Sequence, residues 1–395
     1  MDTVSSFDNL APDTIHIIVG LSSPSGYVAL IHTWSKFRCM KRVFNKDDII
    51  KDSLQYKRHD LFLYLLSMGF SAKNIDVNRI VALYGNLEML KWCHNAGYPW
   101  SENICGNAAE GGHLEVLKYA HENSCPWNSW VCTHAARGGY LEILKYAHEN
   151  DCPWYKDVCS SAAKKGHLEV LKYLHENGCP WDANTCSNAA SQGHLEVLKY
   201  AHHNGCSWDS LTCSNAAHGG HLDVLKHAHE NGCPWDSLIC SNAAAGGHLE
   251  VLKYAHHNGC SWDEFTCSYA AGEGHLEVLK YARENGCPWN KRTCSFAAHG
   301  GHLEVLKYAR KNGCPWDTKT CSEAAERGHL EILKYAHNND CPWNEDTCGN
   351  ATYQGHLEVL KYAHENGCPW NKDTCLKHAK QYKYYHIVEW INSLD

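Results

Sequence analysis

The stretch GHLEVLKYAHENGCPW, Gly355 to Trp370, decides the fold, because close copies of it recur along most of the 395 residues. Each copy starts 27 residues after the one before, and Tyr140 takes the place of the histidine in one of them. The other copies start at Gly112, Gly166, Gly193, Gly220, Gly247, Gly274, Gly301 and Gly328. A fixed period of this length predicts a stacked array in which each unit packs on its neighbours.

The first half of each unit predicts a short helix. In the unit that follows Trp235, Asp236 can cap the sequence SLICSNAA by accepting a hydrogen bond from a free backbone N–H. Gly246 and Gly247 then interrupt the helix. We therefore expect one helix between the Trp and the paired glycines of every unit.

A second helix follows the glycines and carries two apolar stripes. Leu249, Leu252 and Ala255 share one face at helical spacing, and Val251 and Tyr254 form the adjoining stripe. A helix with two apolar stripes is covered on two sides, by its own unit and by the next one. The pattern thus predicts an all-α array.

The charged and turn positions complete the unit. Glu250 and Lys253 are three residues apart and are expected on the solvent side. Gly259 follows Asn258 and supplies a left-handed helix end. Three units have another residue in place of this glycine, each after an Asn, which also tolerates that conformation. These residues are Ser124, Asp151 and Asp340.

The repeat weakens toward both ends of the chain. NLEMLKWCHNAGYPW, residues 86–100, is a clear relative, whereas residues 58–70 and 387–390 match after a one-residue slip. Degenerate end units are typical of solenoids, because the outermost face has no neighbour. We expect residues 56–395 to form about twelve units, preceded by a helical segment over residues 1–55.

The combination of Ala-Ala, Gly-His-Leu-Glu-Val-Leu-Lys-Tyr and Asn-Gly in one unit resembles the core of the ankyrin repeat. The resemblance implies a helical solenoid that binds a protein partner. Ankyrin repeats run about 33 residues and project a β-hairpin finger where this chain has only CPWD or a close variant. TCSN also replaces the family's TPLH. The short repeat is similar to ankyrin proteins of giant DNA viruses of protists, which implies an intracellular protein in the host cytoplasm.

Composition narrows the function classes. Apolar residues make up 44% of the chain and charged residues 20%, which indicates a folded protein. The net charge is −8, and the first 85 residues hold ten basic and eight acidic residues, so the repeats carry the acidic excess. An acidic array argues against nucleic acid as a partner. We see no signal peptide and no uninterrupted apolar run of about 18 residues, and expect no membrane partner.

The 23 cysteines recur once or twice per unit. Without an export signal, they are expected to be reduced, buried thiols that pack as small apolar side chains. Zinc sites usually pair ligands two to four residues apart, whereas Cys233 and Cys240 are seven apart. We therefore expect no metal ligands.

Eleven of the fifteen tryptophans occupy one slot of the repeat. They could form an exposed stacking platform for bases or sugars. The favoured interpretation is structural, with each Trp filling the gap that the shortened loop leaves between units. The residues are Trp100, Trp127, Trp154, Trp181, Trp208, Trp235, Trp262, Trp289, Trp316, Trp343 and Trp370.

The recurring polar residues do not indicate catalysis. The histidine that opens each second helix is expected to bridge neighbouring turns by hydrogen bonds. P-loop, GxSxG and HExxH motifs are absent from the sequence, and acidic residues such as Glu115 and Glu142 recur once per unit on the solvent face. We expect neither catalytic nor cofactor-binding residues, and a monomeric protein that is not an enzyme.

The slot three residues after each Trp varies freely between units. It holds aromatic, apolar, basic and acidic side chains, which a buried position would not accept. We expect an exposed strip, although drift at an unconstrained position would give the same variety. The candidate partner-binding residues on it are Trp130, Leu211, Leu238, Phe265, Arg292 and Lys319.

The N-terminal segment does not repeat. Leu10 to Met40, LAPDTIHIIVGLSSPSGYVALIHTWSKFRCM, resembles an F-box, a motif that docks on the adaptor subunit of cullin-type ubiquitin ligases. A helical cap over the first unit is the alternative. The sequence thus favours a non-catalytic scaffold for a protein partner. The alternative is a substrate adaptor that the N-terminus recruits to a ubiquitin ligase.

Overall fold

The computed structural model describes residues 51, 54, 76–101 and 103–394, and those residues form 24 α-helices without a β-strand. The predicted all-α repeat fold is therefore confirmed. The expected N-terminal segment over 1–55 and the degenerate unit at 58–70 lie outside the described residues, apart from Lys51 and Leu54. The chain divides into two units, Met1–Pro180 and Trp181–Asp395.

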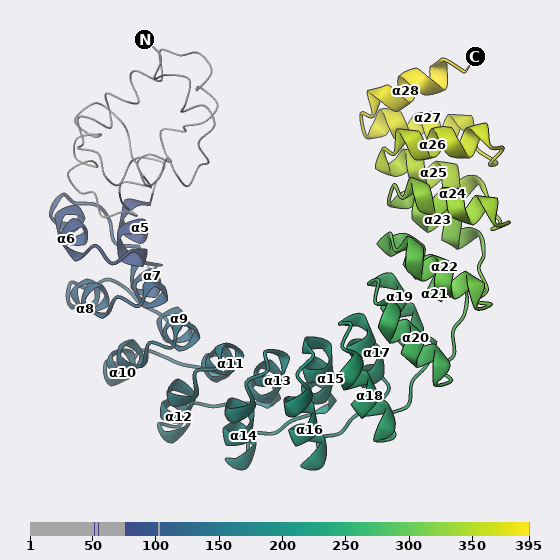
Figure 1. The fold of residues 1–395 in the computed structure, drawn as a ribbon. Coiled ribbons are helices and arrows are strands. Elements are labelled where there is room, and N and C mark those ends of the chain that lie inside the picture. Colours follow the sequence, from purple (N-terminus) through teal and green to yellow (C-terminus); the bar gives the residue numbers. More distant parts are fainter. Residues whose placement is uncertain (1–50, 52–53, 55–75, 102, 395) are drawn as a thin grey trace, which may run out of the picture. The chain divides into compact units, whose positions relative to one another are not determined.

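The first unit contains four helix pairs in its described part, and each pair is one repeat (Figure 1). The first helices of the pairs contact one another in sequence order. The pairs are α5 (Val77–Leu83) with α6 (Leu87–Asn95), α7 (Asn103–Gly111) with α8 (Leu114–Glu122), α9 (Trp130–Gly138) with α10 (Leu141–Glu149), and α11 (Lys156–Lys165) with α12 (Leu168–Glu176).

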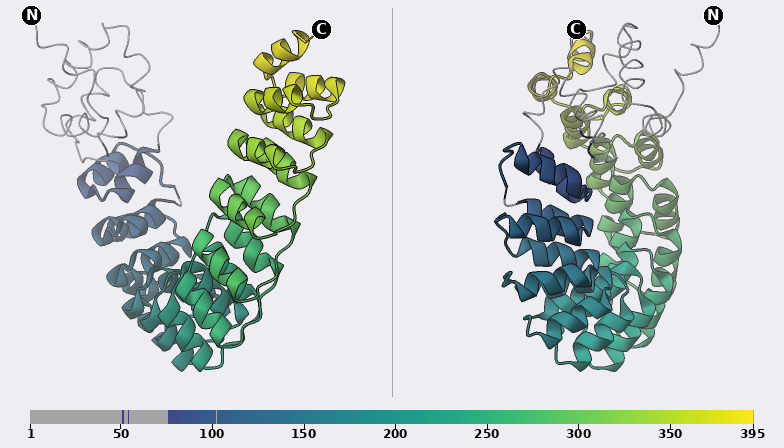
Figure 2. Two further views of the ribbon diagram at one scale, coloured as in Figure 1. Left: turned by 45° about the vertical axis from the view of Figure 1, so that its right-hand side comes forward. Right: turned by 90° about the vertical axis from the view of Figure 1, so that its left-hand side faces the viewer.

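The second unit contains eight pairs, and its first and second helices form two layers (Figure 2). The pairs are α13 (Ala183–Ser191) with α14 (Leu195–His203), α15 (Ser210–Gly219) with α16 (Leu222–Glu230), α17 (Leu238–Ala245) with α18 (Leu249–His257), α19 (Glu264–Gly272) with α20 (Leu276–Glu284), α21 (Lys291–Gly300) with α22 (Leu303–Lys311), α23 (Thr318–Glu326) with α24 (Leu330–Asn338), α25 (Glu345–Gln354) with α26 (Leu357–Glu365), and α27 (Lys372–Gln381) with α28 (Tyr385–Asn392).

Most of the first helices begin where the acidic or amide residue after the Trp caps them, as predicted. Oδ1 of Asp236 accepts the backbone N–H of Leu238 at 2.9 Å. Asp209 caps α15 in the same way, through the N–H of Leu211 at 3.0 Å. Such a bond satisfies one of the free donors at a helix start and stabilises the helix by about 1 kcal/mol.

Most second helices end on a glycine with positive φ, such as Gly259 at φ 81°. In the three units without this glycine, Ser124, Asp151 and Asp340 adopt the left-handed conformation themselves, at φ 60°, 59° and 63°. The preceding Asn is not the left-handed residue, contrary to our expectation. Asn123 has φ −97°, and its side-chain amide donates instead to the carbonyl of Tyr119 at 2.8 Å.

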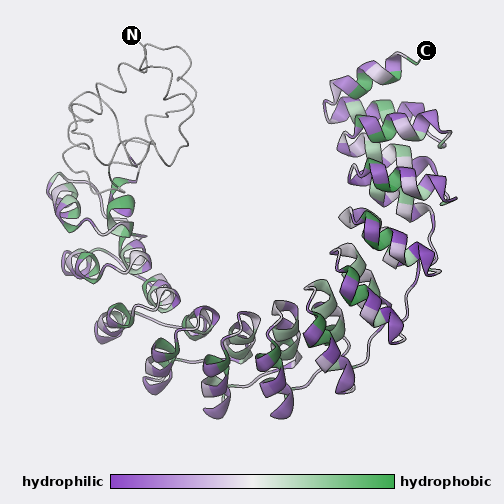
Figure 3. Cartoon of the chain, in the orientation of Figure 1, coloured by the Kyte–Doolittle hydropathy of each residue, from purple (hydrophilic) through white to green (hydrophobic). Residues whose placement is uncertain are grey.

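The core lies between the two helix layers of each unit (Figure 3). First helices contribute the Ala-Ala pair and a cysteine, as with Cys240, Ala243 and Ala244, which are fully buried. Second helices contribute residues such as Leu252 and Ala255, also fully buried. Small side chains let successive first helices approach closely, so the repeats stack without a large central core.

A histidine at the start of most second helices bonds the preceding repeat, as expected. Nε2–H of His248 donates to the carbonyl of His218, thirty residues earlier, at 3.0 Å. His275 and Ala245 make the equivalent bond at 3.1 Å. Further members of this series, at 3.1 to 3.3 Å, are His113, His167, His221, His329 and His356.

The Trp side chains form an aromatic seam along the second helices and do not form an exposed platform. The Trp262 ring stacks on His256 at a centroid distance of 3.7 Å and contacts the edge of Tyr281, in the next repeat, at 6.3 Å. Trp262 is half-buried. The seam therefore joins neighbouring repeats, in agreement with the structural interpretation of CPW.

The Glu–Lys pairs of the second helices face solvent. Nζ of Lys253 lies 2.7 Å from Oε1 of Glu250, and the same pair recurs in nine other repeats. Exposed pairs of this kind contribute only about 0.3–0.5 kcal/mol each. They keep the outer face soluble and do not decide the fold.

All 22 cysteines in the described residues are buried thiols outside disulfide bonds. The loop thiols bond the loop of the preceding repeat, as where Sγ of Cys260 donates to the carbonyl of Asp236 at 3.1 Å. Burial raises the pKa of Cys93 to about 12. Hydrogen bonding to Cys260 and burial raise the pKa of Cys240. The same hydrogen bond lowers the pKa of the loop thiol of Cys260. The helix thiol of this pair is therefore the less reactive one near neutral pH, because thiolates are the reactive species.

Two glycines with nearly the same backbone conformation allow the crowding between repeats to be measured. Gly247 and Gly259 have φ of +76° and +81°. A Cβ on Gly247 would lie 2.5 Å from Cε1 of His275, whereas a Cβ on Gly259 meets nothing within 4 Å. Gly259→Ala should lower the free energy of unfolding by about 1 kcal/mol, because alanine disfavours the left-handed backbone. Gly247→Ala should lower it by about 1–3 kcal/mol more, because its Cβ would also clash with the histidine ring. Urea unfolding followed by circular dichroism measures both, and equal losses would contradict close packing of the histidine on the turn.

The buried thiols predict slow alkylation. In the native chain at pH 8, iodoacetamide should modify the 22 described cysteines far more slowly than in urea. Mass spectrometry of tryptic peptides gives the rate at each position. Neither reductant nor chelator should change helicity measured by circular dichroism. Rapid labelling of most of these positions in the native protein would show that the thiols are accessible.

Candidate protein-binding surface

The predicted strip lies in the first turn of the first helices. Backbone N–H groups at these positions bond the capping side chain two residues earlier, as Arg292 does with Oδ1 of Asn290 at 2.8 Å. The next residue points inward, and Thr212, Thr266 and Thr293 are fully buried there. The backbone is thus fixed by its neighbours while the side chain of the strip position is left to vary.

Five of the six candidate residues are exposed. Trp130 in the first unit is 60% exposed, and its ring makes an edge contact with His134. In the second unit, Leu211 and Leu238 are 53% and 52% exposed. Arg292 and Lys319 are exposed as well. Exposed leucines on consecutive repeats are the kind of apolar surface that often marks an interaction site.

Phe265 differs from the expectation, since its side chain is half-buried. The guanidinium of Arg292 lies 5.3 Å from the centre of its ring, a cation–π contact. The ring centres of Phe265 and Tyr269 are 5.9 Å apart, and the two rings make a small interplanar angle. The ring centre of Phe296 lies 6.1 Å from that of Tyr269. We call Phe265, Tyr269 and Phe296 the aromatic cluster.

Sequence reasoning missed two members of this cluster. Tyr269 and Phe296 are seven residues after a Trp, one helical turn beyond the strip position, where Asn188, Asn215 and Asn242 stand in other repeats. The signal was available, because residues four apart share a face of a helix. The strip is therefore one edge of a wider face that the first helices present.

The basic end of the strip is available for charge pairing. Nζ of Lys291 lies 2.9 Å from Oδ2 of Asp317. Arg292 and Lys319 make no such ion pair among the described residues. Two uncompensated cations thus follow the apolar residues along α21 and α23.

The described residues contain no cluster of three or more His, Cys, Asp or Glu side chains arranged to hold a metal ion. Within the same ranges, none of the helices combines the length and the apolar character that crossing a membrane requires.

Comparison with known proteins identifies ankyrin repeats in two segments of the chain. A family model for ankyrin repeats in many copies matches residues 159–202 and 267–317. Among solved structures, the ankyrin repeat domain of human ASB11 aligns with 40% of this chain and 84% of that domain, at 18% sequence identity and a TM-score of 0.35. No curated protein matches the chain in sequence.

Ankyrin repeats are generally protein–protein interaction modules, and their fold is typically a non-catalytic scaffold. The matched segments contain the Ala-Ala pair, the Gly-His turn and the amphipathic second helix that suggested the resemblance. Residues 159–202 and 267–317 thus carry ankyrin repeats, within an all-α array of helix pairs.

Proposed function

We propose that this chain is a non-catalytic scaffold that binds a protein partner along the first helices of its second unit. The observation that carries the proposal is the pair of half-exposed leucines, Leu211 and Leu238, on consecutive repeats, followed by the aromatic cluster. A folded chain stabilises itself by burying such side chains, so their exposure on adjacent helices favours a partner that covers them.

The chemistry of the strip suggests the kind of partner. An apolar segment of the partner would lie over Leu211, Leu238 and Phe265, and an acidic segment would face Arg292 and Lys319. Charge complementarity of this kind sets orientation and speeds association. Because the loops between repeats are short, the contact surface would come from helix side chains. The proposal requires no second copy of the chain and no nucleic acid.

A second candidate is a substrate adaptor of a cullin-type ubiquitin ligase. It is favoured by the resemblance of Leu10–Met40 to an F-box, which lies outside the described residues. In this hypothesis the array selects the substrate and the N-terminal segment recruits the ligase. The two candidates share the binding surface and differ only in what the N-terminus does.

The 27-residue period and the CPW loops support an origin among the short-repeat ankyrin proteins of giant DNA viruses of protists. In that setting we propose that the protein acts in the cytoplasm of the host cell. Partners would then be host or viral proteins.

Replacing the apolar part of the strip tests the scaffold proposal. The triple variant Leu211→Ser, Leu238→Ser and Phe265→Ser should retain its thermal midpoint within a few degrees, because two of the side chains are half-exposed and surface changes cost little. Affinity for partners captured by the wild-type chain should fall by about tenfold or more, since buried apolar anchors dominate interfaces. Quantitative mass spectrometry after affinity capture measures the loss.

The matched control changes three solvent-facing residues of the second helices, Glu196→Ser, Glu250→Ser and Glu277→Ser. It should bind as the wild type does. A strip variant that folds and captures the same partners at wild-type levels would show that the strip is unconstrained surface. A strip variant that unfolds would show that the contacts of Phe265 with Arg292 and Tyr269 are needed for the stability of the array.

Deleting residues 1–50 distinguishes the two candidates. If the N-terminus recruits a ligase, capture from host-cell extract should yield the ligase adaptor subunit with the full chain and lose it with the deletion, while other partners remain. Circular dichroism provides the folding control for the array. Absence of any ligase subunit from both samples would rule out the adaptor role.

A further inference from the structure

Ten pairs of cysteines recur along the described part of the array, and the two members of each pair are twenty residues apart. One member lies in a first helix, as Cys240 does in α17. The other lies in the loop after the second helix of the same repeat, as Cys260 does after α18. The fold creates this pairing, since Cys233 and Cys240 are only seven residues apart and belong to different pairs.

The two thiols of a pair are in contact. The side chains of Cys240 and Cys260 are hydrogen-bonded to each other. Sγ of Cys240 also lies 3.8 Å from the carbonyl oxygen of Cys260, and Sγ of Cys260 donates to the carbonyl of Asp236 at 3.1 Å. A thiol–thiol hydrogen bond joins eight other pairs in the same way. Each helix thiol thus has a loop thiol as its neighbour.

The two members of a pair differ in chemistry. The hydrogen bond from Cys240 lowers the pKa of Cys260, and the same bond, with burial, raises the pKa of Cys240. Cys233 and its helix partner Cys213 show the same two directions. The loop sulfur therefore carries more thiolate, while the helix sulfur keeps its proton and is available for a second step. A thiol with a lowered pKa beside a second thiol is typical of cysteines that react with oxidants.

The loop cysteine is also the member of the pair that borders on solvent. Cys260 and Cys233 keep 5% and 4% of their surface exposed, whereas Cys240 and Cys213 have none. Hydrogen peroxide is a smaller molecule than the alkylating reagent iodoacetamide, and it needs to reach only the loop sulfur. The helix thiol does not have to be reached from solvent, because it would react with the loop sulfur that it already contacts.

We propose that these cysteine pairs are sites of reversible oxidation by hydrogen peroxide, independently of the scaffold function. The Cys260 thiolate attacks one peroxide oxygen, the O–O bond breaks and hydroxide leaves, so that the sulfur becomes a sulfenic acid. The Cys240 thiol then attacks this sulfur, the S–O bond breaks, and the hydroxyl leaves as water with the thiol proton. Two electrons have passed from the two thiols to the peroxide, which ends as two waters. A small-molecule thiol reverses the disulfide by exchange.

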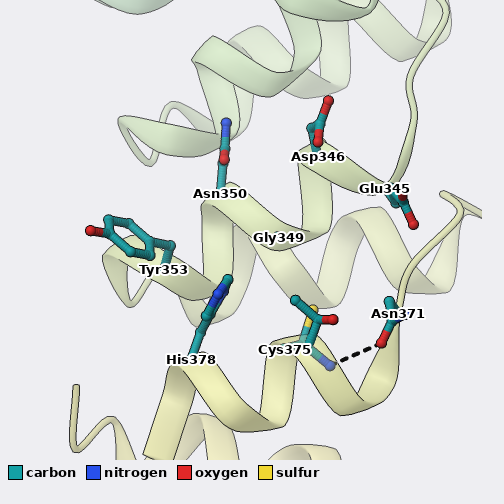
Figure 4. Close-up of a pocket in the computed structure, with 9 residues that line it drawn as sticks. Glu345, Asp346, Gly349, Asn350, Tyr353, Asn371, Cys375 and His378 are labelled. Atoms are coloured by element: carbon teal, nitrogen blue, oxygen red, sulfur yellow. Dashed lines mark hydrogen bonds between the residues drawn. The ribbon is translucent and has the colours of Figure 1, made fainter. Parts of the chain in front are cut away.

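Helix α27 provides an internal control. Cys375 occupies the helix position there, and its backbone N–H donates to the carbonyl of Asn371 at 3.0 Å (Figure 4). It borders a cavity of about 280 Å³ between α25 and α27, together with Gly349 and His378. The position twenty residues later holds Asp395 in place of a cysteine. Burial raises the pKa of Cys375. Cys375 should therefore remain a thiol, although it lies beside a cavity.

The test treats the reduced full chain with hydrogen peroxide near neutral pH. The remaining thiols are then blocked with N-ethylmaleimide in denaturant, and the non-reduced tryptic peptides are sequenced by mass spectrometry. Cross-links should join cysteines twenty residues apart, such as Cys240 and Cys260, and dithiothreitol should remove them. Cys375 should be recovered as its maleimide adduct, because it should be oxidised at least about tenfold more slowly than the loop thiols.

Two single variants separate the roles of the two sulfurs. In Cys240→Ser, Cys260 should accumulate as a sulfenic acid that dimedone traps, because the resolving thiol is missing. In Cys260→Ser, Cys240 should stay a thiol. Cys375→Ser is the matched control and should leave the Cys240–Cys260 cross-link unchanged. Circular dichroism reports folding, and the cross-link map of the wild-type chain decides the question if a variant does not fold.

Several outcomes would overturn the proposal. Recovery of the paired cysteines as unmodified thiols would show that peroxide does not reach the loop sulfurs. Equal oxidation of Cys375 and the paired cysteines would show that pairing has no influence. Cross-links between cysteines seven residues apart, such as Cys233 and Cys240, in place of those twenty apart would show that oxidation follows unfolding and not the native contacts.

Discussion

The imidazole–carbonyl hydrogen bond between consecutive repeats is the interaction on which the rest of the array depends. A unit of 27 residues cannot cover both of its apolar faces, so each must be held in register with the next. His248 does this by crossing to the carbonyl of His218, and the turn that carries it is built from Gly246 and Gly247. The bond is worth only about 1 kcal/mol. Its effect comes from repetition at the same place in successive turns.

Two further rows of contacts follow from this register. Loop thiols such as that of Cys260 bond the preceding loop, and the tryptophans join neighbouring second helices. The aromatic seam tolerates change, because arginine replaces the usual histidine in two repeats. The guanidinium carbons of Arg283 and Arg310 lie 4.6 Å and 4.4 Å from the ring centres of Trp289 and Trp316. Buried thiols, ring stacking and turn bonds together fix the backbone. The outward side chains of the first helices are therefore free to differ from repeat to repeat.

Much of this could be predicted from the sequence, because the pattern repeats. The caps, the paired helices, the buried cysteines and the exposed strip position each follow from local chemistry that many copies support. The burial of Phe265 could not be predicted, since it depends on Arg292 of the next repeat folding back over the ring. The cavity at α25 and α27 was missed for a related reason. Gly349 and His378 are single departures, and their consequence depends on how the terminal pair packs.

The shortened loops determine where recognition can occur. Because the loops carry no β-hairpin fingers, a partner can contact only helix surfaces and the few gaps between neighbouring repeats. The proposed strip, with the aromatic cluster next to it, would use the first possibility. An apolar strip of single residues gives area but little orientation, whereas charged side chains such as Arg292 and Lys319 would set the orientation of a partner. A partner that contacted both kinds of side chain, all within the second unit, would gain affinity from the leucines and orientation from the two cations.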